Sequence, residues 1–157
     1  MRKSSERRIE RGTVHSENSI VVNRTPDEVF AFLADGLNNP RWRPGVRSIE
    51  LAQGAPGQVG TVYRQKLAGP GGRAVDGDYE ITTAEAPRTL AFRVTAGPAR
   101  PTGRYTLQPE GTGTRLTFAL DLEPKGLIRL MSGTIHKTME SEVGQLPRLK
   151  QVLEGGA

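Results

Sequence analysis

The segment PKGLIRLMSGTIHKTMESEVGQLPRLKQVLE, residues 124–154, decides the fold. Its apolar residues recur at intervals of three and four, which places them on one face of a helix. They are Ile128, Met131, Ile135, Met139, Val143, Leu146, Leu149 and Leu153. The segment predicts one long amphipathic helix that starts after Pro124 and ends before Gly155, with a bend near Gly144 and Pro147.

The stretch before this helix has the period of two that is typical of strands. Turn clusters rich in glycine and proline divide it into six candidate strands, at 46–53, 59–68, 73–84, 88–96, 99–109 and 114–123. The connections are short, and parallel strands would need crossovers of about a dozen residues. We therefore expect antiparallel neighbours.

The chain opens with a further expected strand, Thr13–Asn23, followed by a helix start. Thr25 is the expected N-cap and Pro26 the first helical residue. Glu28, three residues after Thr25, completes the sequence pattern of a capping box. Two short helices are expected between this strand and position 46. The predicted fold class is α+β, a helix-grip fold in which a curved antiparallel sheet of six to seven strands wraps around the long C-terminal helix.

Length and composition predict one domain. The chain has 157 residues, no cysteine and a net charge of +5. Residues 1–12 hold five basic and two acidic residues and are expected to be a disordered basic arm, with one domain over 13–157. The remaining charges are mixed, so no nucleic acid partner is expected. Neither a signal peptide nor a membrane span is predicted, so we expect a cytoplasmic protein without membrane insertion, monomeric or homodimeric.

The inward phase of the predicted sheet is unusually polar. It contains all three tyrosines, Tyr63, Tyr79 and Tyr105, together with Thr61 and Gln65. A purely packed face would favour aliphatic residues, because each buried hydroxyl or amide needs a partner. Together with the small residues Gly77 and Gly103, this pattern favours a cavity with polar groups. The alternative is that the hydroxyls reach the rim and contact water or backbone.

Several segments resemble the START-like superfamily, also called SRPBCC or Bet v 1-like. They are Ile20-Val21-Val22, the helix positions Pro26, Val29, Phe30, Leu33 and Asp35, then Trp42, the turn Gly54–Gly60, and Glu142–Lys150, which is similar to the polyketide cyclase/dehydrase branch. The resemblance covers about residues 16–154 and implies a pocket for a hydrophobic ligand. Some members of the superfamily cyclise or dehydrate polyketides, and many are binding proteins.

The leading hypothesis is binding of a lipid, polyketide or similar hydrophobic molecule between the sheet and the helix. The candidate ligand-binding residues come from the inner face, the start of the sheet and the helix. They are Trp42 (at the entrance), Tyr63, Gln65, Tyr79, Phe92, Tyr105, Phe118, Met131, Ser132, Ile135 and His136. Two alternatives stay open: a polyketide cyclase/aromatase-like enzyme, and an interaction module that uses the basic arm to contact an acidic partner.

Catalytic chemistry has few candidates. His136, Tyr79 and Tyr105 could transfer protons, although His136 is also explained as an exposed residue at the helix margin. Glu142 lies on the apolar stripe, but we expect it in solvent, because the superfamily's helix often protrudes there. His15, Asp76, Asp78, Arg100 and Arg104 are expected to point outward. Two distant histidines without cysteine give no metal-ligand spacing, and no cofactor is expected.

Overall fold

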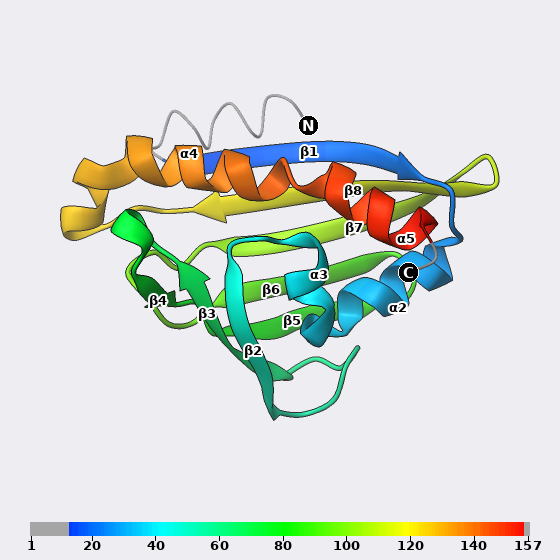
Figure 1. Cartoon of the computed structure of the whole chain (residues 1–157), viewed down its shortest axis with the longest axis horizontal. Helices are drawn as coiled ribbons and strands as arrows, with labels where there is room; N and C mark the ends of the chain where they lie inside the picture. The colour runs from blue at the N-terminus through cyan, green and yellow to red at the C-terminus, as the bar shows by residue number, and fades with distance from the viewer. Residues whose placement is uncertain (1–12, 156–157) are drawn as a thin grey trace.

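The computed structural model describes residues 13–155, which form one antiparallel sheet with helices on its inner face (Figure 1). The strand order is β1-β8-β7-β6-β5-β3-β2, with β4 paired to β3. The strands are β1 (Val14–Val22), β2 (Val46–Gln53), β3 (Val62–Ala68), β4 (Ala74–Asp76), β5 (Tyr79–Glu85), β6 (Thr89–Val94), β7 (Thr102–Glu110) and β8 (Gly113–Leu122). The helix-grip architecture is confirmed.

The sheet has eight strands rather than the expected six to seven. The difference arises at Gly77 and Asp78, which interrupt the expected strand 73–84 and divide it into β4 and β5. The Gly77 N–H donates to the Gln65 carbonyl at 2.8 Å, so the chain stays close to β3 through the interruption. The strands expected at 59–68 and 99–109 begin later, at Val62 and Thr102.

Two short helices follow β1 as expected, α2 (Pro26–Ala34) and α3 (Asn39–Trp42), joined by the 3₁₀ turn η1 (Gly36–Asn38). The predicted capping box is present: the Thr25 hydroxyl accepts from the Glu28 N–H, and the Glu28 carboxylate accepts from the Thr25 N–H. This satisfies two of the free donors at the start of α2. Another 3₁₀ turn, η2 (Pro70–Gly72), precedes β4.

The C-terminal segment is broken where a bend was predicted. It consists of the 3₁₀ helix η3 (Gly126–Met131), α4 (Ser132–Val143) and α5 (Leu146–Glu154). Gly144 and Gln145 separate the two α-helices, and Pro147 lies in the first turn of α5. A proline there loses no helical hydrogen bond, because the first-turn N–H groups have no partner within the helix. The residues before Ser132 form a 3₁₀ helix instead of the expected α-helix.

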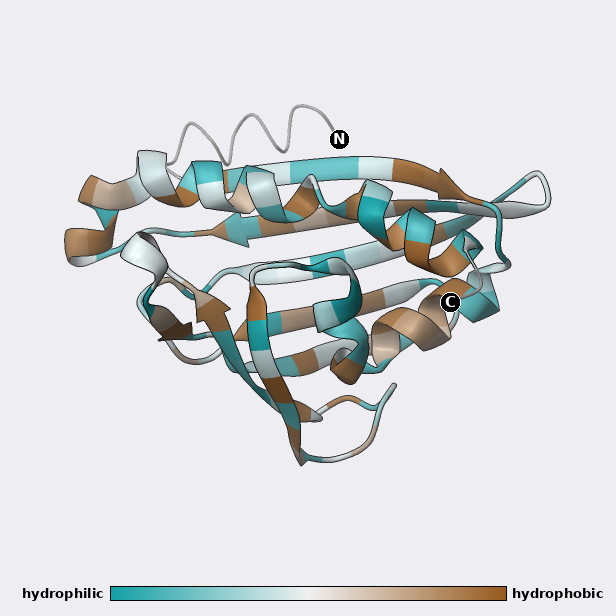
Figure 2. Cartoon of the chain, in the orientation of Figure 1, coloured by the Kyte–Doolittle hydropathy of each residue, from teal (hydrophilic) through white to brown (hydrophobic). Residues whose placement is uncertain are grey.

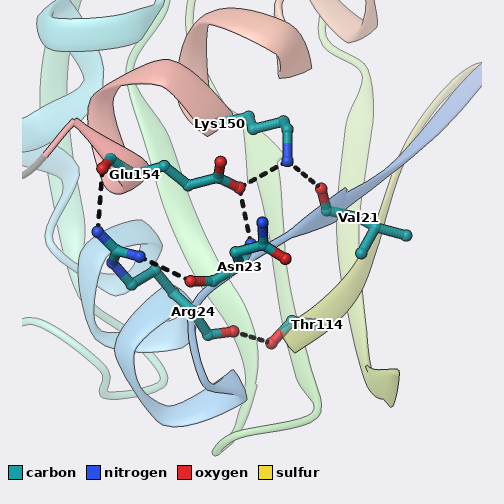
Figure 3. Close-up of polar contacts among 6 residues, drawn as sticks. All are labelled: Val21, Asn23, Arg24, Thr114, Lys150 and Glu154. Atoms are coloured by element: carbon teal, nitrogen blue, oxygen red, sulfur yellow. Dashed lines mark hydrogen bonds and ion pairs between the residues drawn. The ribbon is translucent and has the colours of Figure 1, made fainter. Parts of the chain in front are cut away.

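The helix α5 is fixed to β1 by buried leucines and by a polar cluster (Figure 3). Leu146 and Leu149 are fully buried. Lys150 Nζ donates to the Val21 carbonyl at 2.8 Å and to Glu154 Oε2 at 2.6 Å. The same carboxylate accepts from the Asn23 N–H at 2.7 Å. The C-terminal end of the chain is thus anchored to the end of β1.

The helix α4 is packed unevenly. Its second half buries Met139 and Val143 in the core, and it contacts β1 and β8. In its first half, residues 132–138, no side chain is buried, and Ile135 is only partly covered. This half of α4, together with η3, extends away from the well-packed part of the domain (Figure 1).

Candidate ligand-binding site

A continuous row of buried aromatic rings crosses the inner face of the sheet. Neighbouring ring centroids are between 4.5 and 6.3 Å apart. The order of the rings is Tyr63, Tyr79, Phe92, Tyr105, Phe118 and Trp42. The alternation of the strands brings the first five to the same face, as predicted from the period of two. Trp42 is buried at the end of α3, where it packs edge-on against Phe118, so it lies inside the domain rather than over an entrance.

The glycines of the inner face do not leave open space. A Cβ atom at Gly103 would lie 2.2 Å from Phe92 Cζ, and one at Gly77 would lie 2.6 Å from Leu67 Cδ1. At Gly36, in η1, it would lie 2.3 Å from the Tyr79 hydroxyl. The space that these small residues provide is therefore filled by neighbouring side chains, which corrects the inference of a void at Gly77 and Gly103.

Asn39 is the centre of a buried polar network. Its Nδ2 donates to the Tyr79 hydroxyl at 2.9 Å and to Gln65 Oε1 at 3.1 Å. Gln65 Nε2 donates to the Gly77 carbonyl at 3.3 Å, and the Tyr63 hydroxyl to the Ala34 carbonyl at 3.3 Å. Two of the three inward tyrosines are therefore engaged within the protein. Sequence reasoning missed Asn39, which lies three residues before Trp42 in α3, a spacing that places both on one face.

The ion pair between Arg43 and Glu142 connects α3 to α4. Arg43 Nε lies 2.8 Å from Glu142 Oε2, and the two side chains are 10% and 22% exposed. The expectation that Glu142 lies in solvent is wrong, because the buried guanidinium draws the carboxylate inward. Burial lowers the pKa of Arg43, but the nearby carboxylate outweighs this and the net shift is upward. The pair thus holds one positive and one negative group in fixed positions at the inner face.

Tyr105 differs from the other two tyrosines. Its ring is stacked on Phe118 and the residue is 5% exposed, yet its hydroxyl makes no hydrogen bond within residues 13–155 and keeps accessible surface, because Ser16 Oγ is the only fully buried side-chain polar atom without a partner in this part of the chain. Arg43 and Glu142 are close enough to act on it electrostatically. Burial raises the pKa values of Tyr105 and Tyr79 above the ordinary value of 10.0. Both phenols are protonated at neutral pH, so Tyr105 offers an unused donor and acceptor.

The candidates on the C-terminal segment are placed differently. Ile135 packs against the core, whereas Met131 is 46% exposed. The Ser132 hydroxyl donates to the Arg129 carbonyl at 2.9 Å, a local contact. The His136 side chain is 47% exposed, with Nδ1 3.9 Å from Glu140 Oε1. No described contact joins Ser132 or His136 to the tyrosines.

Two hollows lie near the sheet. One, of about 1190 Å³, is lined by outward strand residues of both charges, including His15, Arg104 and Asp121, and it also reaches Phe92 of the aromatic row and Ile128 of η3. The other, of about 340 Å³, lies between β1 and α4 and includes His15, Ser16 and His136. His15 is only 16% exposed and its Nδ1 lies 2.7 Å from Asp121 Oδ1. The smaller hollow is mainly polar, and the larger one is lined about equally by polar and apolar groups, so neither is the mostly apolar pocket expected from the sequence.

The remaining charged candidates on the strands lie on the outer side. Asp76 pairs with Lys66, and Asp78 accepts from the Gln65 N–H at 3.1 Å. Arg100 and Arg104 are exposed. Within residues 13–155, no group of three or more histidine, aspartate or glutamate side chains is arranged to hold a metal ion. None of the helices in this part of the chain has the length and apolar character that crossing a membrane requires. The arm, residues 1–12, lies outside the described residues.

The sheet, the C-terminal helices and the inner aromatic row define a Bet v 1-like helix-grip protein. The chain belongs to the family described as polyketide cyclase / dehydrase and lipid transport, which it matches over residues 13–154. The resemblance noted in the sequence is confirmed. No curated protein matches the chain.

Solved structures share the fold at low identity. Ara h 8.0201 is 17% identical, with a TM-score of 0.70 over 91% of this chain and 99% of that chain. TTHA0849 from Thermus thermophilus is 23% identical, with a TM-score of 0.71 over 92% and 99%. The di-domain ARO/CYC protein StfQ, from the steffimycin biosynthetic pathway, is 15% identical with a TM-score of 0.74; 99% of this chain aligns with 57% of that chain. These similarities establish the architecture.

Proposed function

We propose that the protein binds a hydrophobic small molecule between the aromatic row and the first half of α4. The observation that carries this proposal is Tyr105, whose ring is buried in the aromatic row while its hydroxyl, near Arg43 and Glu142, keeps accessible surface and bonds to no group in residues 13–155. A ligand oxygen could therefore reach this hydroxyl, and one such hydrogen bond contributes about 1 kcal/mol. The family's descriptive name, which includes lipid transport, agrees with such a ligand.

The packing of α4 also supports a ligand site beneath its first half. Residues 132–138 bury no side chain, and Ile128 and Ile135 are only partly covered by the core. An apolar molecule inserted beneath this half-helix would cover Ile128, Ile135 and the nearby sheet without displacing the well-packed Met139 and Val143. Burial of apolar surface would supply most of the affinity, at about 25 cal/mol per Å² before the cost of ordering.

The aromatic residues have separate roles in this proposal. Phe92, Phe118 and Trp42 form the apolar floor beside Tyr105. Tyr63, Tyr79 and Gln65 hold the floor in place, because their polar groups are bonded within the protein. Tyr105 and the Arg43–Glu142 pair remain to orient a ligand oxygen. Ser132 and His136 are left out of the site because their described contacts are elsewhere on α4.

The test combines native mass spectrometry with a fluorescent probe. Gentle purification from the native host should retain an apolar small molecule in a one-to-one complex. The probe anilinonaphthalene sulfonate should bind saturably and quench Trp42, the only tryptophan of the chain. Loss of one hydrogen bond in Tyr105→Phe should weaken probe or ligand binding by about fivefold. The control is Gln108→Ala, an exposed position on the same strand.

Two results would contradict the proposal. One is the absence of saturable binding by the probe and by apolar extracts of the host. The other is binding that Tyr105→Phe and Ile135→Asn both leave unchanged, because ligand would then sit elsewhere. The hollow of about 1190 Å³ that His15, Arg104 and Asp121 line would become the next position to test.

A second candidate function, polyketide cyclase-like catalysis, is favoured by the ionisable groups at the same place. Tyr105 is a protonated phenol at neutral pH and lies near the fixed cation Arg43. Such an arrangement could polarise a ligand carbonyl and donate a proton to it. Turnover of a polyketide-like substrate should then be lost in Tyr105→Phe while binding persists. Unchanged turnover in this variant would exclude Tyr105 from the chemistry and leave the binding function.

A further inference from the structure

The 3₁₀ helix η3 exposes large apolar side chains at one end of the molecule. Leu127 is 81% exposed, Leu130 is 85% exposed and Met131 is 46% exposed. The turn buries none of its own residues. In Figure 2 the ribbon at this end, which lies farthest from α5, is coloured as strongly hydrophobic. Scattered exposed leucines are common, but three such residues within one short turn form a patch that needs explanation.

The geometry of η3 directs this patch away from the core. Residues three apart lie above one another in a 3₁₀ helix, so Leu127 and Leu130 share one side. Ile128, on the next side, packs against the core. Gly126 has a φ of +58°, a left-handed conformation that favours glycine, and it turns the chain into η3. The two leucines are thereby presented outward from a turn whose other side is fixed.

Positive charge predominates around the patch. Lys125, Arg129 and Lys137 are all exposed and residues 124–139 contain no acidic residue, although the exposed Glu123 and Glu140 lie directly beyond this stretch. Elsewhere on the described surface the charges are mixed, as in the pairs Arg64–Glu50 and Arg93–Glu80. A cluster of apolar side chains beside basic ones matches the surface of a bilayer with anionic headgroups, which offers acyl chains and phosphates together.

We propose that η3 is a docking element for anionic phospholipid bilayers, in which Leu127 and Leu130 enter the headgroup boundary and Lys125, Arg129 and Lys137 contact phosphates. A second copy of the chain fits the patch less well, because a stable interface needs about 800 Å² per partner and the like charges around η3 would repel. The contact is peripheral and requires no spanning helix. It stands independently of the proposed ligand-binding function.

The experiment is cosedimentation of the full chain with phosphatidylcholine vesicles, with and without added phosphatidylserine. We expect binding only when phosphatidylserine is present, and a decline with added salt. Leu127→Ser/Leu130→Ser should weaken this binding about tenfold or more. Lys125→Gln/Arg129→Gln should weaken it by a similar factor.

Matched controls separate this surface from general stickiness or charge. Val59 is 64% exposed in a different turn, so Val59→Ser removes an exposed apolar side chain without touching η3. Arg88→Gln/Arg148→Gln removes two exposed positive charges elsewhere. Both controls should bind vesicles as the unmodified chain does. Circular dichroism melts should show that all variants are folded, because every changed side chain is exposed.

Several outcomes would overturn the proposal. Absence of binding to the phosphatidylserine vesicles would do so directly. Binding that survives both η3 variants and disappears when residues 1–12 are deleted would assign the contact to the basic arm. A concentration-dependent dimer that the leucine variant dissociates, without vesicle binding, would assign the patch to a second copy. Retained anilinonaphthalene sulfonate binding by the η3 variants would confirm that any loss concerns the membrane contact rather than the ligand site.

Discussion

Arg43 and Glu142 join the end of α3 to the last turn of α4, with Nε and Oε2 2.8 Å apart although the two residues are 99 positions apart in the chain. The contact holds the tightly packed end of α4, where Met139 and Val143 are buried, against the rest of the domain. Both side chains are largely removed from water. The loss of one partner should therefore cost more stability than the loss of a partner from the exposed ion pairs of the strands.

Removing one partner of this pair should destabilise the domain. Arg43→Met or Glu142→Leu alone leaves a poorly hydrated charge, and each should lower the free energy of unfolding by about 2–3 kcal/mol. The double variant should lose less than the sum of the two, because no unpaired charge remains. Urea denaturation measures all three.

The control for this cycle is Arg64→Met, whose pair with Glu50 has both side chains 66% exposed. Its loss should stay below about 1 kcal/mol. Strict additivity in the Arg43 and Glu142 cycle would show that the two side chains are not coupled in solution.

The inner face of the sheet was predictable because strand alternation is a local property. It placed Tyr63, Tyr79 and Tyr105 on one side from the sequence alone, and all three are buried there. The partners of these residues were not predictable in the same way. Asn39 lies 40 residues from Tyr79, and nothing periodic in α3 indicates that its amide reaches the sheet.

The environment of Glu142 was predicted wrongly for a related reason. A helical pattern shows which face is apolar, but it does not show which charge from another element meets that face. Arg43 follows a four-residue helix, too short to have a readable period. The glycines led to a different wrong prediction, that of open space at the inner face. Gly103 has no side chain, but the ring of Phe92 occupies the space beside it.

The hydroxyls of Tyr79 and Tyr105 should contribute differently to stability. Tyr79→Phe removes the acceptor of the 2.9 Å bond from Asn39 Nδ2 and should cost about 1 kcal/mol. Tyr105→Phe removes a hydroxyl that keeps accessible surface and makes no hydrogen bond within residues 13–155, so the free energy of unfolding of the ligand-free protein should change little. Equal losses in chemical denaturation would mean that Tyr105 has a partner inside the protein, and the argument for a ligand contact would fail.

A methyl group at Gly103 should disturb the aromatic row. Gly103→Ala places Cβ within 2.2 Å of the Phe92 ring, and such overpacking costs about 1–3 kcal/mol. Gly133→Ala is the matched change in α4, where nothing lies within 4 Å of the added atom. It should stabilise the helix by up to about 1 kcal/mol. Thermal unfolding of both variants checks the pair; a tolerated Gly103→Ala would show that Phe92 is free to move.

The anchor of α5 should make stability depend on acid pH. The Glu154 carboxylate accepts from the Asn23 N–H and from Lys150 Nζ, and these bonds lower its pKa below the ordinary 4.5. A group with a lowered pKa in the folded state stabilises it above the unfolded-state value, and this contribution is lost as pH falls through the lowered value. Glu154→Gln should therefore be less stable than the unmodified chain at neutral pH, and the difference should narrow in acid.

The measurement is a series of urea denaturation curves from neutral pH down through the acid range, for the unmodified chain, Glu154→Gln and the control Glu85→Gln, an exposed residue at the end of β5. Only Glu154→Gln should flatten the decline of stability with falling pH. A decline that is the same in all three proteins would mean that the carboxylate is not held by Asn23 and Lys150 in solution, and α5 would then be attached mainly by its buried leucines Leu146 and Leu149 and by bonds that do not use this carboxylate.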